Sequence, residues 1–155
     1  MKALVIFDSV FGNTEKIARA IGAALGREPD VTVVSVNGLS AERLQGLDVL
    51  FVGSPTRQFR ATPAITAFLA ALPDGFLKGM KAAAFDTRIH LKNPLTRFIV
   101  NRGGYADKII AIELIRLGAV QPIPTAGFIV LESEGPVKEG ELQRAGEWAT
   151  NILQD

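Results

Sequence analysis

One short stretch near the start of the chain limits the possible folds more than any other feature. An apolar run at residues 3–7 leads into a polar turn at residues 8–15 (DSVFGNTE), and apolar side chains then recur at helical spacing over residues 14–26. A strand therefore enters a helix through a turn that carries hydroxyl groups and a glycine. N–H groups at a helix start lack partners and the helix dipole attracts negative charge, so the stretch predicts a site for an anion such as phosphate.

The side chains of this turn suit a phosphate held by neutral donors. Ser9 and Thr14 offer hydroxyl groups, Asn13 offers an amide, and Gly12 permits a positive φ and a close approach of the backbone. The turn lacks both GxxxxGK[ST] and GxGxxG, which argues against a P-loop NTPase and against a dinucleotide-binding Rossmann turn. The alternative interpretation is an ordinary turn in which Thr14 caps the helix.

Strand and helix patterns alternate along the rest of the chain. Strands are expected at residues 3–7, 31–36, 48–53, 81–85 and within 120–130, and helices at 14–26, 41–45, 62–72, 94–101, 105–117 and 139–153. This alternation predicts an α/β fold with a five-stranded parallel sheet and right-handed crossovers. The 155 residues fit a single domain, residues 1–155.

The composition excludes several classes of protein. Hydrophobic residues make up 48% and charged residues 21% of the chain, which is typical of a globular domain. The absence of cysteine excludes disulfides, thiol catalysis and cysteine-based zinc sites, and one histidine leaves little for a catalytic triad or a multi-histidine metal site. A net charge of +1 implies no bulk attraction to nucleic acid. No apolar run reaches the ~20 residues of a transmembrane segment, and a strand pattern directly after Met1-Lys2 leaves no room for a signal peptide, so we expect a cytoplasmic protein.

Three polar loops should meet at one edge of the sheet. They follow the first, third and fourth strands, at residues 9–14, 54–60 and 86–88. Parallel strands end on the same side, and open α/β sheets bind ligands beyond the carboxyl ends of the strands, where the strand order reverses. We therefore expect the binding site at this edge.

These loops together resemble those of the flavodoxin family, and the likeness extends over essentially the whole chain. Residues 9–14 (SVFGNT) are similar to the family's [ST]-x-[TF]-G-x-T phosphate loop, residues 52–56 (VGSPT) to the G-[ST]-P-T after its third strand, and residues 86–88 (DTR) occupy the position that flanks the flavin ring. Residues 134–141 are similar to a branch of flavodoxin-like proteins in which flavin binding is presumed. The resemblance implies a doubly wound flavodoxin-like domain, with a five-stranded sheet of order 2-1-3-4-5 and one bound FMN.

The resemblance also implies which residues hold the cofactor. The phosphate would lie on residues of the first loop, and the ring between residues 54–59 and 86–88. The implied cofactor-binding residues are Ser9, Val10, Phe11, Gly12, Asn13, Thr14, Ser54, Pro55, Thr56, Arg57, Phe59, Asp86, Thr87 and Arg88.

The aromatic residues depart from those of the electron-carrying flavodoxins, which place a Trp or Tyr against the ring. The one tryptophan, Trp148, falls in the last helix, where we expect it in the core or at the sheet edge. Phe59, and after it Tyr105, are the candidates for stacking on the flavin. The alternative for both is packing of their own segments.

The charge departs as well, because carrier flavodoxins are acidic. Basic residues gather beside the expected ring site, at Arg57, Arg60, Arg88 and Lys92. One cation about 6 Å away, at an effective dielectric constant of about 20, stabilises an added negative charge by roughly 3 kcal/mol, on the order of 0.1 V for one electron. These charges predict that the second one-electron reduction of the flavin is easier here than in an acidic carrier. The alternative is that they are solvated surface charges.

Residues 89–102 form an insert with an apolar face and basic flanks. The apolar residues on one helical face are Leu91, Leu95, Phe98 and Ile99, and the basic residues between them are Lys92, Arg97 and Arg102. Such a segment could cover the flavin, dock a partner, make weak contact with a membrane surface, or pack as a lid on its own domain.

These observations favour an FMN-binding redox protein that exchanges electrons with a partner protein or a small acceptor. The alternatives are an FMN-dependent NAD(P)H or quinone oxidoreductase and a flavin-free binding module of flavodoxin shape. No dinucleotide motif supports the oxidoreductase, although the arginines could hold a second anionic substrate. The oligomeric state stays open.

Overall fold

The computed structural model describes residues 1–91 and 93–155, with the side chains of all of these except residues 100–103. The elements follow one another as β1 (Ala3–Phe7), α1 (Asn13–Leu25), β2 (Val31–Ser35), the short 3₁₀ helix η1 (Ala41–Leu44), β3 (Val49–Pro55), α2 (Pro63–Ala70), β4 (Lys81–Ile89), α3 (Pro94–Gly103), α4 (Ala106–Arg116), β5 (Thr125–Val130) and α5 (Glu141–Gln154). Each strand and helix expected from the sequence is present, and most bounds differ by a few residues.

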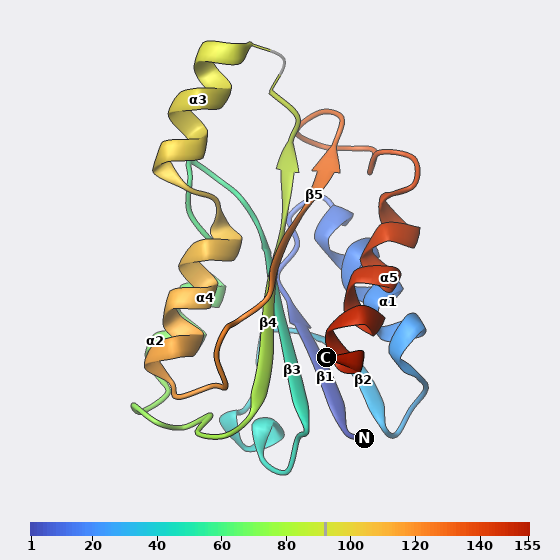
Figure 1. Ribbon diagram of the computed structural model, residues 1–155, viewed down its shortest axis with the longest axis vertical. Coiled ribbons are helices and arrows are strands. Elements are labelled where there is room, and N and C mark those ends of the chain that lie inside the picture. The colour runs from blue at the N-terminus through green and yellow to red at the C-terminus, as the bar shows by residue number, and fades with distance from the viewer. Residues whose placement is uncertain (92) are drawn as a thin grey trace.

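The five strands form one parallel sheet in the order β2-β1-β3-β4-β5, with helices on both of its faces (Figure 1). Ile65 of α2 and Ile110 of α4 are buried on one face, and Ile17 of α1 and Ala149 of α5 on the other. The central strands β1 and β3 are apolar almost throughout because both of their faces are covered. The predicted fold class and strand order are confirmed.

The aromatic part of the core lies between the sheet and α5. Trp148 packs edge-on against the rings of Phe51, Phe85 and Phe128, with ring centroids 5.8, 6.4 and 5.9 Å away. Trp148 is half-buried against this core, which agrees with the expectation that it lies in the core or at the sheet edge. This packing holds α5 against the middle of β3, β4 and β5.

Gly53 lets this core reach the end of β3. A Cβ atom at this position would overlap the Phe85 ring on the neighbouring strand. The glycine of the 52–56 motif therefore has a packing reason that needs no ligand. It allows Phe85 to fill the core directly beneath the loop that follows β3.

The fourth strand corrects one expectation. Residues 86–88 are predicted in a loop, but they belong to β4, which continues to Ile89 because β3 pairs with it as far as Thr87 and β5 to its end. Pro55 of β3 lies opposite Thr87, and β5 runs alongside as far as Val130. Asp86, Thr87 and Arg88 are consequently held as strand residues whose side chains alternate between the two faces of the sheet.

Two helix starts and one insert refine the sequence interpretation. α1 begins at Asn13 with Gly12 as its N-cap at φ 89°, so Thr14 lies inside the helix. α2 starts with Pro63 after the N-cap Thr62, as predicted.

In the insert, Leu95, Phe98 and Ile99 are exposed, so the alternative of a lid packed on its own domain is wrong for these side chains. None of the helices formed by described residues has the length and apolar character needed to cross a bilayer.

Candidate ligand-binding site

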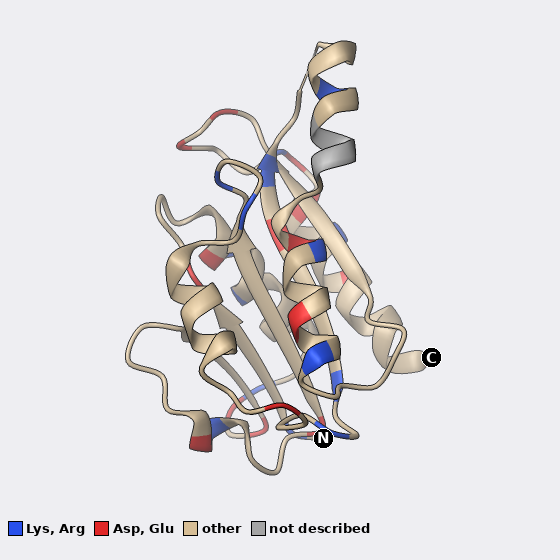
Figure 2. Cartoon of the chain, turned by 90° about the vertical axis from the view of Figure 1, so that its left-hand side faces the viewer, with Lys and Arg blue, Asp and Glu red and all other residues tan. Residues whose placement is uncertain are grey.

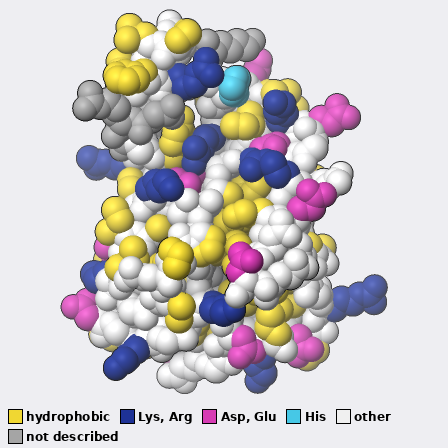
Figure 3. Space-filling model, viewed as in Figure 1, with side chains coloured by type: hydrophobic (Ala, Val, Ile, Leu, Met, Phe, Trp, Pro, Cys, Tyr) yellow, Lys and Arg dark blue, Asp and Glu magenta, His cyan; other side chains and the backbone are white. Residues whose placement is uncertain are grey.

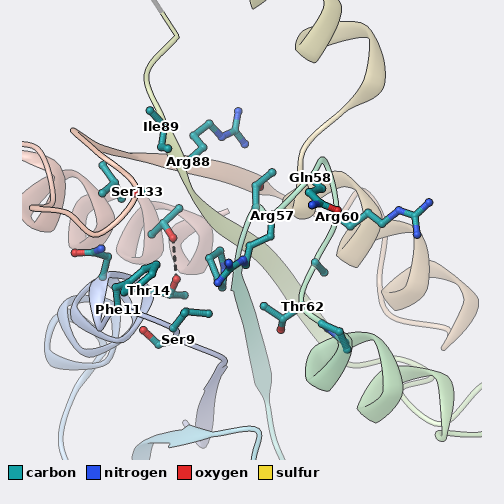
Figure 4. A pocket seen from close by; sticks show the side chains of 18 residues that line it. Ser9, Phe11, Thr14, Arg57, Gln58, Arg60, Thr62, Arg88, Ile89 and Ser133 are labelled. Carbon is teal, nitrogen blue, oxygen red and sulfur yellow. Dashed lines mark hydrogen bonds between the residues drawn. The ribbon is translucent and has the colours of Figure 1, made fainter.

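A cavity of about 550 Å³ opens at the carboxyl ends of the strands. Residues from the segments that follow β1, β3 and β5 line it, together with the end of β4 (Figure 4). The implied site residues that line it are Ser9, Val10, Phe11, Asn13, Thr14, Pro55, Thr56, Arg57, Thr87 and Arg88. The lining also contains Gln58 and Arg60 of the predicted 54–60 loop. Residues not inferred as part of the site from the sequence are Ala61, Thr62, Pro63, Ile89, Val130 and Ser133.

The end of the cavity beside α1 offers backbone donors. Ser9 Oγ accepts hydrogen bonds from the N–H groups of Gly12 at 3.0 Å and Glu15 at 3.4 Å, which shapes the turn. Within the described part of the chain, nothing accepts a hydrogen bond from the N–H groups of Phe11, Asn13 and Thr14. Donors without partners at a helix start are the arrangement that binds a phosphate.

Two hydroxyl groups meet at the same end. Thr14 Oγ1 of α1 and Thr87 Oγ1 of β4 lie 2.7 Å apart in a buried contact, drawn as the dashed line in Figure 4. Each hydroxyl carries one proton, so this contact uses one proton and leaves the other to donate elsewhere. The contact also ties the start of α1 to the extended part of β4, which the sequence interpretation had as a loop.

A tight hairpin forms the opposite wall. The backbones of Arg57 and Arg60 exchange two hydrogen bonds of 2.9 Å, and Gln58 and Phe59 between them have φ values of 50° and 65°. Such two-residue turns normally use glycine or asparagine, and each other residue costs on the order of 1 kcal/mol in this conformation. The strain lies at the rim of the cavity, where strained residues tend to serve function.

The hairpin places its side chains differently from expectation. Phe59 is 46% exposed and is not among the cavity-lining residues, so the structure does not set it against the site as the stacking interpretation expected. The Arg57 guanidinium carbon instead lies 5.9 Å from the centroid of the Phe11 ring, so that this side chain extends from the hairpin to the α1 end of the cavity. Arg60 extends away from that end (Figure 4).

The hydroxyl groups around the start of α2 have separate roles. Ser54 is fully buried and outside the lining, because its Oγ accepts the N–H of Thr62 at 2.9 Å and its own proton points to the Pro55 carbonyl. Thr62 Oγ1 is buried at the cavity wall and has no hydrogen-bond partner among the described residues. An unpaired buried hydroxyl in a cavity wall is a candidate ligand contact, and the sequence had suggested only a helix cap here.

Arg88 is held by two acids on the α4 side of β4. Its guanidinium donates to both carboxylate oxygens of Asp86 at 2.7 Å, lies 3.3 Å from Asp107, and sits 3.6 Å above the centroid of the Tyr105 ring. Gly127 on β5 leaves room for it, since a Cβ there would overlap the guanidinium. We call Asp86, Arg88, Tyr105 and Asp107 the inner cluster.

Burial dominates the electrostatics of the inner cluster. Desolvation raises the pKa of Asp86 to about 6, although the hydrogen bonds and charge of Arg88 pull it down. Burial also opposes the charge on Arg88, but the hydrogen bonds and charge of Asp86 outweigh it and raise the pKa of Arg88. The expectation that Arg88 adds a free positive charge beside the ring site is therefore corrected, because two carboxylates surround it.

The remaining cations near the cavity are the hairpin arginines. Arg57 and Arg60 are exposed, and neither forms an ion pair with any described residue. Lys92, also expected near the ring, lies outside the described residues. Asp86 is buried behind the lining, and Gly12 is the N-cap of α1, where it supports the turn rather than the wall.

The fold and the site together define an open α/β domain with a phosphate-type loop at the carboxyl edge of its sheet. A family model described as "Flavodoxin domain" matches residues 4–95, more than half of the chain. The chain belongs to this family of flavodoxin domains, which confirms the family inferred from the three loops.

Solved structures show the same fold at low sequence identity. Oxidised Flavodoxin 2 from Bacillus cereus superposes with a TM-score of 0.78 at 22% identity, covering 99% of this chain and 99% of that one. A flavodoxin from the domain Archaea superposes with a TM-score of 0.71 at 21% identity, covering 99% of this chain and 97% of that one. A flavodoxin described as WrbA-like, from Agrobacterium tumefaciens, superposes with a TM-score of 0.74 at 14% identity, covering 99% of this chain and 95% of that one. No curated protein sequence matches the chain.

Proposed function

We propose that this protein binds FMN at the carboxyl edge of its sheet and exchanges electrons with a partner protein or a small acceptor. The observation that carries the proposal is the α1 end of the cavity. There, three backbone N–H groups and one hydroxyl proton have no hydrogen-bond acceptor among the described residues. Residues 1–155 act as one domain of this kind, in the cytoplasm. The flavodoxins among the similar structures support the proposal.

The residues present fit the cofactor. The cavity of about 550 Å³ has the size of small-molecule sites, which span roughly 300–1,000 Å³. Ser9, Phe11, Asn13 and Thr14 would hold the phosphate through neutral donors, and Gly12 would shape the turn that presents them. The ring would lie between the segment that follows β3 and the end of β4. When bound, the flavin supplies the electron-transfer chemistry, and the protein supplies binding, orientation and charge.

The hairpin arginines set the electrostatic character of the site. Arg57 and Arg60 offer positive charge without a carboxylate partner among the described residues, whereas Arg88 is neutralised. We therefore expect the second one-electron reduction to be easier than in an acidic carrier, with Arg57 rather than Arg88 responsible. Cations stabilise an added negative charge in proportion to their proximity and inversely to screening by water.

An FMN titration tests the proposal directly. The purified protein is examined by visible absorption and then titrated with FMN while quenching of flavin fluorescence is followed. We expect saturable quenching at micromolar FMN, and about tenfold weaker binding by Thr14→Val, which loses one hydrogen bond to a charged group. Thr150→Val is the matched control, because the Thr150 hydroxyl bonds within α5. Absence of quenching by the wild-type protein would overturn the proposal and leave a flavin-free binding module.

A second candidate function is an FMN-dependent NAD(P)H or quinone oxidoreductase. Arg57 and Arg60, which form no ion pair with any described residue, favour it, since they could receive an anionic second substrate. Steady-state oxidation of NADPH with added FMN and a quinone distinguishes the two functions. NADPH oxidation that is slower in Arg57→Gln than in the wild-type protein would support the oxidoreductase function. No NADPH oxidation by protein that binds FMN would support the electron-carrier function instead.

A further inference from the structure

The helix α3 presents its apolar stripe to solvent. Leu95, Phe98 and Ile99 share one face of the helix and are 68%, 58% and 57% exposed. The helix stands beyond the carboxyl ends of the strands in both ribbon views (Figures 1 and 2). A helix of a globular domain normally turns such a stripe toward the core. This stripe is turned away from the sheet, and the space-filling view shows it as a projecting apolar patch (Figure 3).

Further exposed apolar side chains lie at the same edge of the sheet. They belong to the segments that follow β1, β3, β4 and β5, and are Val10, Phe11, Phe59, Ile89 and Leu131. Ile89 both lines the cavity and is 43% exposed, so apolar surface continues from the cavity mouth toward α3. Gathering of exposed apolar residues at one end marks an interaction surface, whereas scattered ones need no explanation.

The charge of this surface is one-sided. Residues 88–106 contain no acid, while His90, Lys92, Arg97 and Arg102 belong to this segment. Arg57 and Arg60 add two cations from the neighbouring hairpin that form no ion pair with any described residue. The exposed acids Glu132 and Glu134 come from the loop after β5, which lies across from α3 in the side view (Figure 2), and Asp8 and Glu15 lie after β1 and in the first turn of α1. The partner surface must therefore be anionic where it meets α3.

From these observations we infer that α3 docks the protein on an anionic lipid bilayer. The residues Leu95, Phe98 and Ile99 enter the boundary between head groups and acyl chains, and the hairpin arginines Arg57 and Arg60 lie on the head groups. Arg97, about 200° round the helix from Leu95, is on the side that faces away from the bilayer. A convex helix with three bulky apolar side chains, basic neighbours and no acid has the character of an interfacial helix. The helix has 10 residues, so binding is weak and reversible.

Docking in this way turns the cavity mouth toward the bilayer, because α3 and the cavity occupy the same edge of the sheet. If the proposed FMN function holds, the electron acceptor or donor is then a molecule dissolved in the lipid. The docking itself rests on the surface of α3 and its basic neighbours, and it is tested both with and without FMN.

The experiment is flotation of the full chain, with and without FMN, on vesicles. One set contains phosphatidylcholine alone and the other equal parts of phosphatidylcholine and phosphatidylglycerol. We expect binding to the anionic vesicles in both flavin states, at least tenfold weaker binding without the anionic lipid, and release by salt, which screens the charges. Leu95→Glu with Ile99→Glu should weaken binding at least tenfold, and Arg57→Gln with Arg60→Gln about threefold.

Matched controls separate docking from general surface effects. Ile112→Glu with Ile115→Glu changes two α4 residues that are 64% and 42% exposed, and Arg27→Gln changes an exposed arginine after α1; neither should alter binding. Three results would overturn the inference. These are absence of binding to anionic vesicles, equal loss in the α4 control, and self-association in sedimentation that Leu95→Glu with Ile99→Glu abolishes. The last would make a second copy of the chain the occupant. FMN titration of the same samples shows whether the proposed function stands regardless of this result.

Discussion

Two arginine clusters flank β5. Both combine an arginine, a carboxylate and an aromatic ring, but they have different roles in the structure. The inner cluster of Asp86, Arg88, Tyr105 and Asp107 lies between β4 and α4 beside the cavity. An outer cluster of Phe128, Glu141 and Arg144 lies between β5 and the start of α5. In each, a guanidinium donates to a carboxylate and lies over an aromatic ring, at 3.6 Å in the inner cluster and 4.5 Å in the outer.

Burial gives the two acids opposite behaviour. Asp86 is fully buried, and desolvation raises its pKa to about 6. Glu141 is less completely buried, and the hydrogen bonds from Arg144, aided by the N–H of Ile129, outweigh its desolvation and lower its pKa. An arginine partner therefore does not decide the direction of a pKa shift by itself, because the loss of water around the acid can exceed its attraction.

The two clusters also differ in whether they supply hydrogen-bond partners to the backbone of β5. Glu141 accepts the N–H of Ile129 at 2.7 Å, and Arg144 donates to the carbonyl of Gly127. Both backbone groups lie on the outer edge of β5, which would otherwise be open to pairing with another strand. The outer cluster thus completes the fold, whereas the inner cluster neutralises a cation beside the ligand cavity.

The largest expected effect comes from breaking the inner cluster. Arg88→Met leaves two carboxylates, with side chains exposed 0% and 5%, without their cation. The free energy of unfolding at pH 7 should fall by about 3–5 kcal/mol. The loss should shrink at pH 5, where the unpaired acid takes up a proton. Denaturant unfolding at both pH values measures this, and a small loss that is equal at both would contradict it.

The second largest expected effect is the change in stability with pH that comes from the titration of Asp86. Its folded-state pKa of about 6 exceeds the ordinary value of 3.8, so the folded state holds this proton more tightly than the unfolded chain. The stabilisation is fully present below pH 3.8 and is lost as the pH rises through 6, by roughly 3 kcal/mol. Asp86→Asn lacks this titration. Wild-type stability should decline between pH 4 and 6 relative to the variant, and parallel curves would count against the raised pKa.

Glu141→Gln tests the outer cluster with the opposite sign. The folded-state pKa of Glu141 is lowered, so its stabilisation is present at pH 7 and is lost as the pH falls through that pKa, below 4.5. We expect the variant to lose about 1–2 kcal/mol at pH 7 and little at pH 3, by thermal or denaturant unfolding. Glu147→Gln, which neutralises an exposed carboxylate that accepts a hydrogen bond from Gln143, is the control and should change stability by less than about 0.5 kcal/mol. An equal loss from both variants would deny the cluster a special role.

The smallest expected effect concerns a cation without a carboxylate. If FMN binds as proposed, Arg57→Gln should lower the potential of the second one-electron reduction by on the order of 40 mV, since an exposed charge is screened by water. Arg144→Gln removes a cation that Glu141 already pairs and should leave the potential unchanged. Potentiometric titration of both variants compares them, and a larger shift in Arg144→Gln would reverse the assignment.

Much of the fold follows from local sequence pattern. The apolar runs of β1 and β3 predict strands buried on both faces, and the alternation with helices leaves few arrangements of a parallel sheet. The turn before α1 was recognisable because hydroxyl groups and a glycine fall at a helix start. The position of Trp148 against the core followed from its place in an amphipathic helix.

The parts that were missed depend on contacts between distant segments. β4 extends to Ile89 only because β3 and β5 pair along it, and this extension brings Asp86 and Arg88 onto one face of a strand. The hairpin at Gln58 and Phe59 has no glycine to signal a positive φ. An amphipathic stripe such as that of α3 reads the same whether it faces a core or solvent, so only the folded chain shows its direction.

The contact between Thr14 and Thr87 has a kinetic consequence. A single hydrogen bond of 2.7 Å between hydroxyl groups already fixes the start of α1 against β4 before a phosphate arrives. A ligand that enters this end of the cavity finds its donors in place, so little conformational entropy is lost on binding. Association should therefore proceed in one kinetic phase whose rate rises linearly with ligand concentration, without a slower phase from loop ordering.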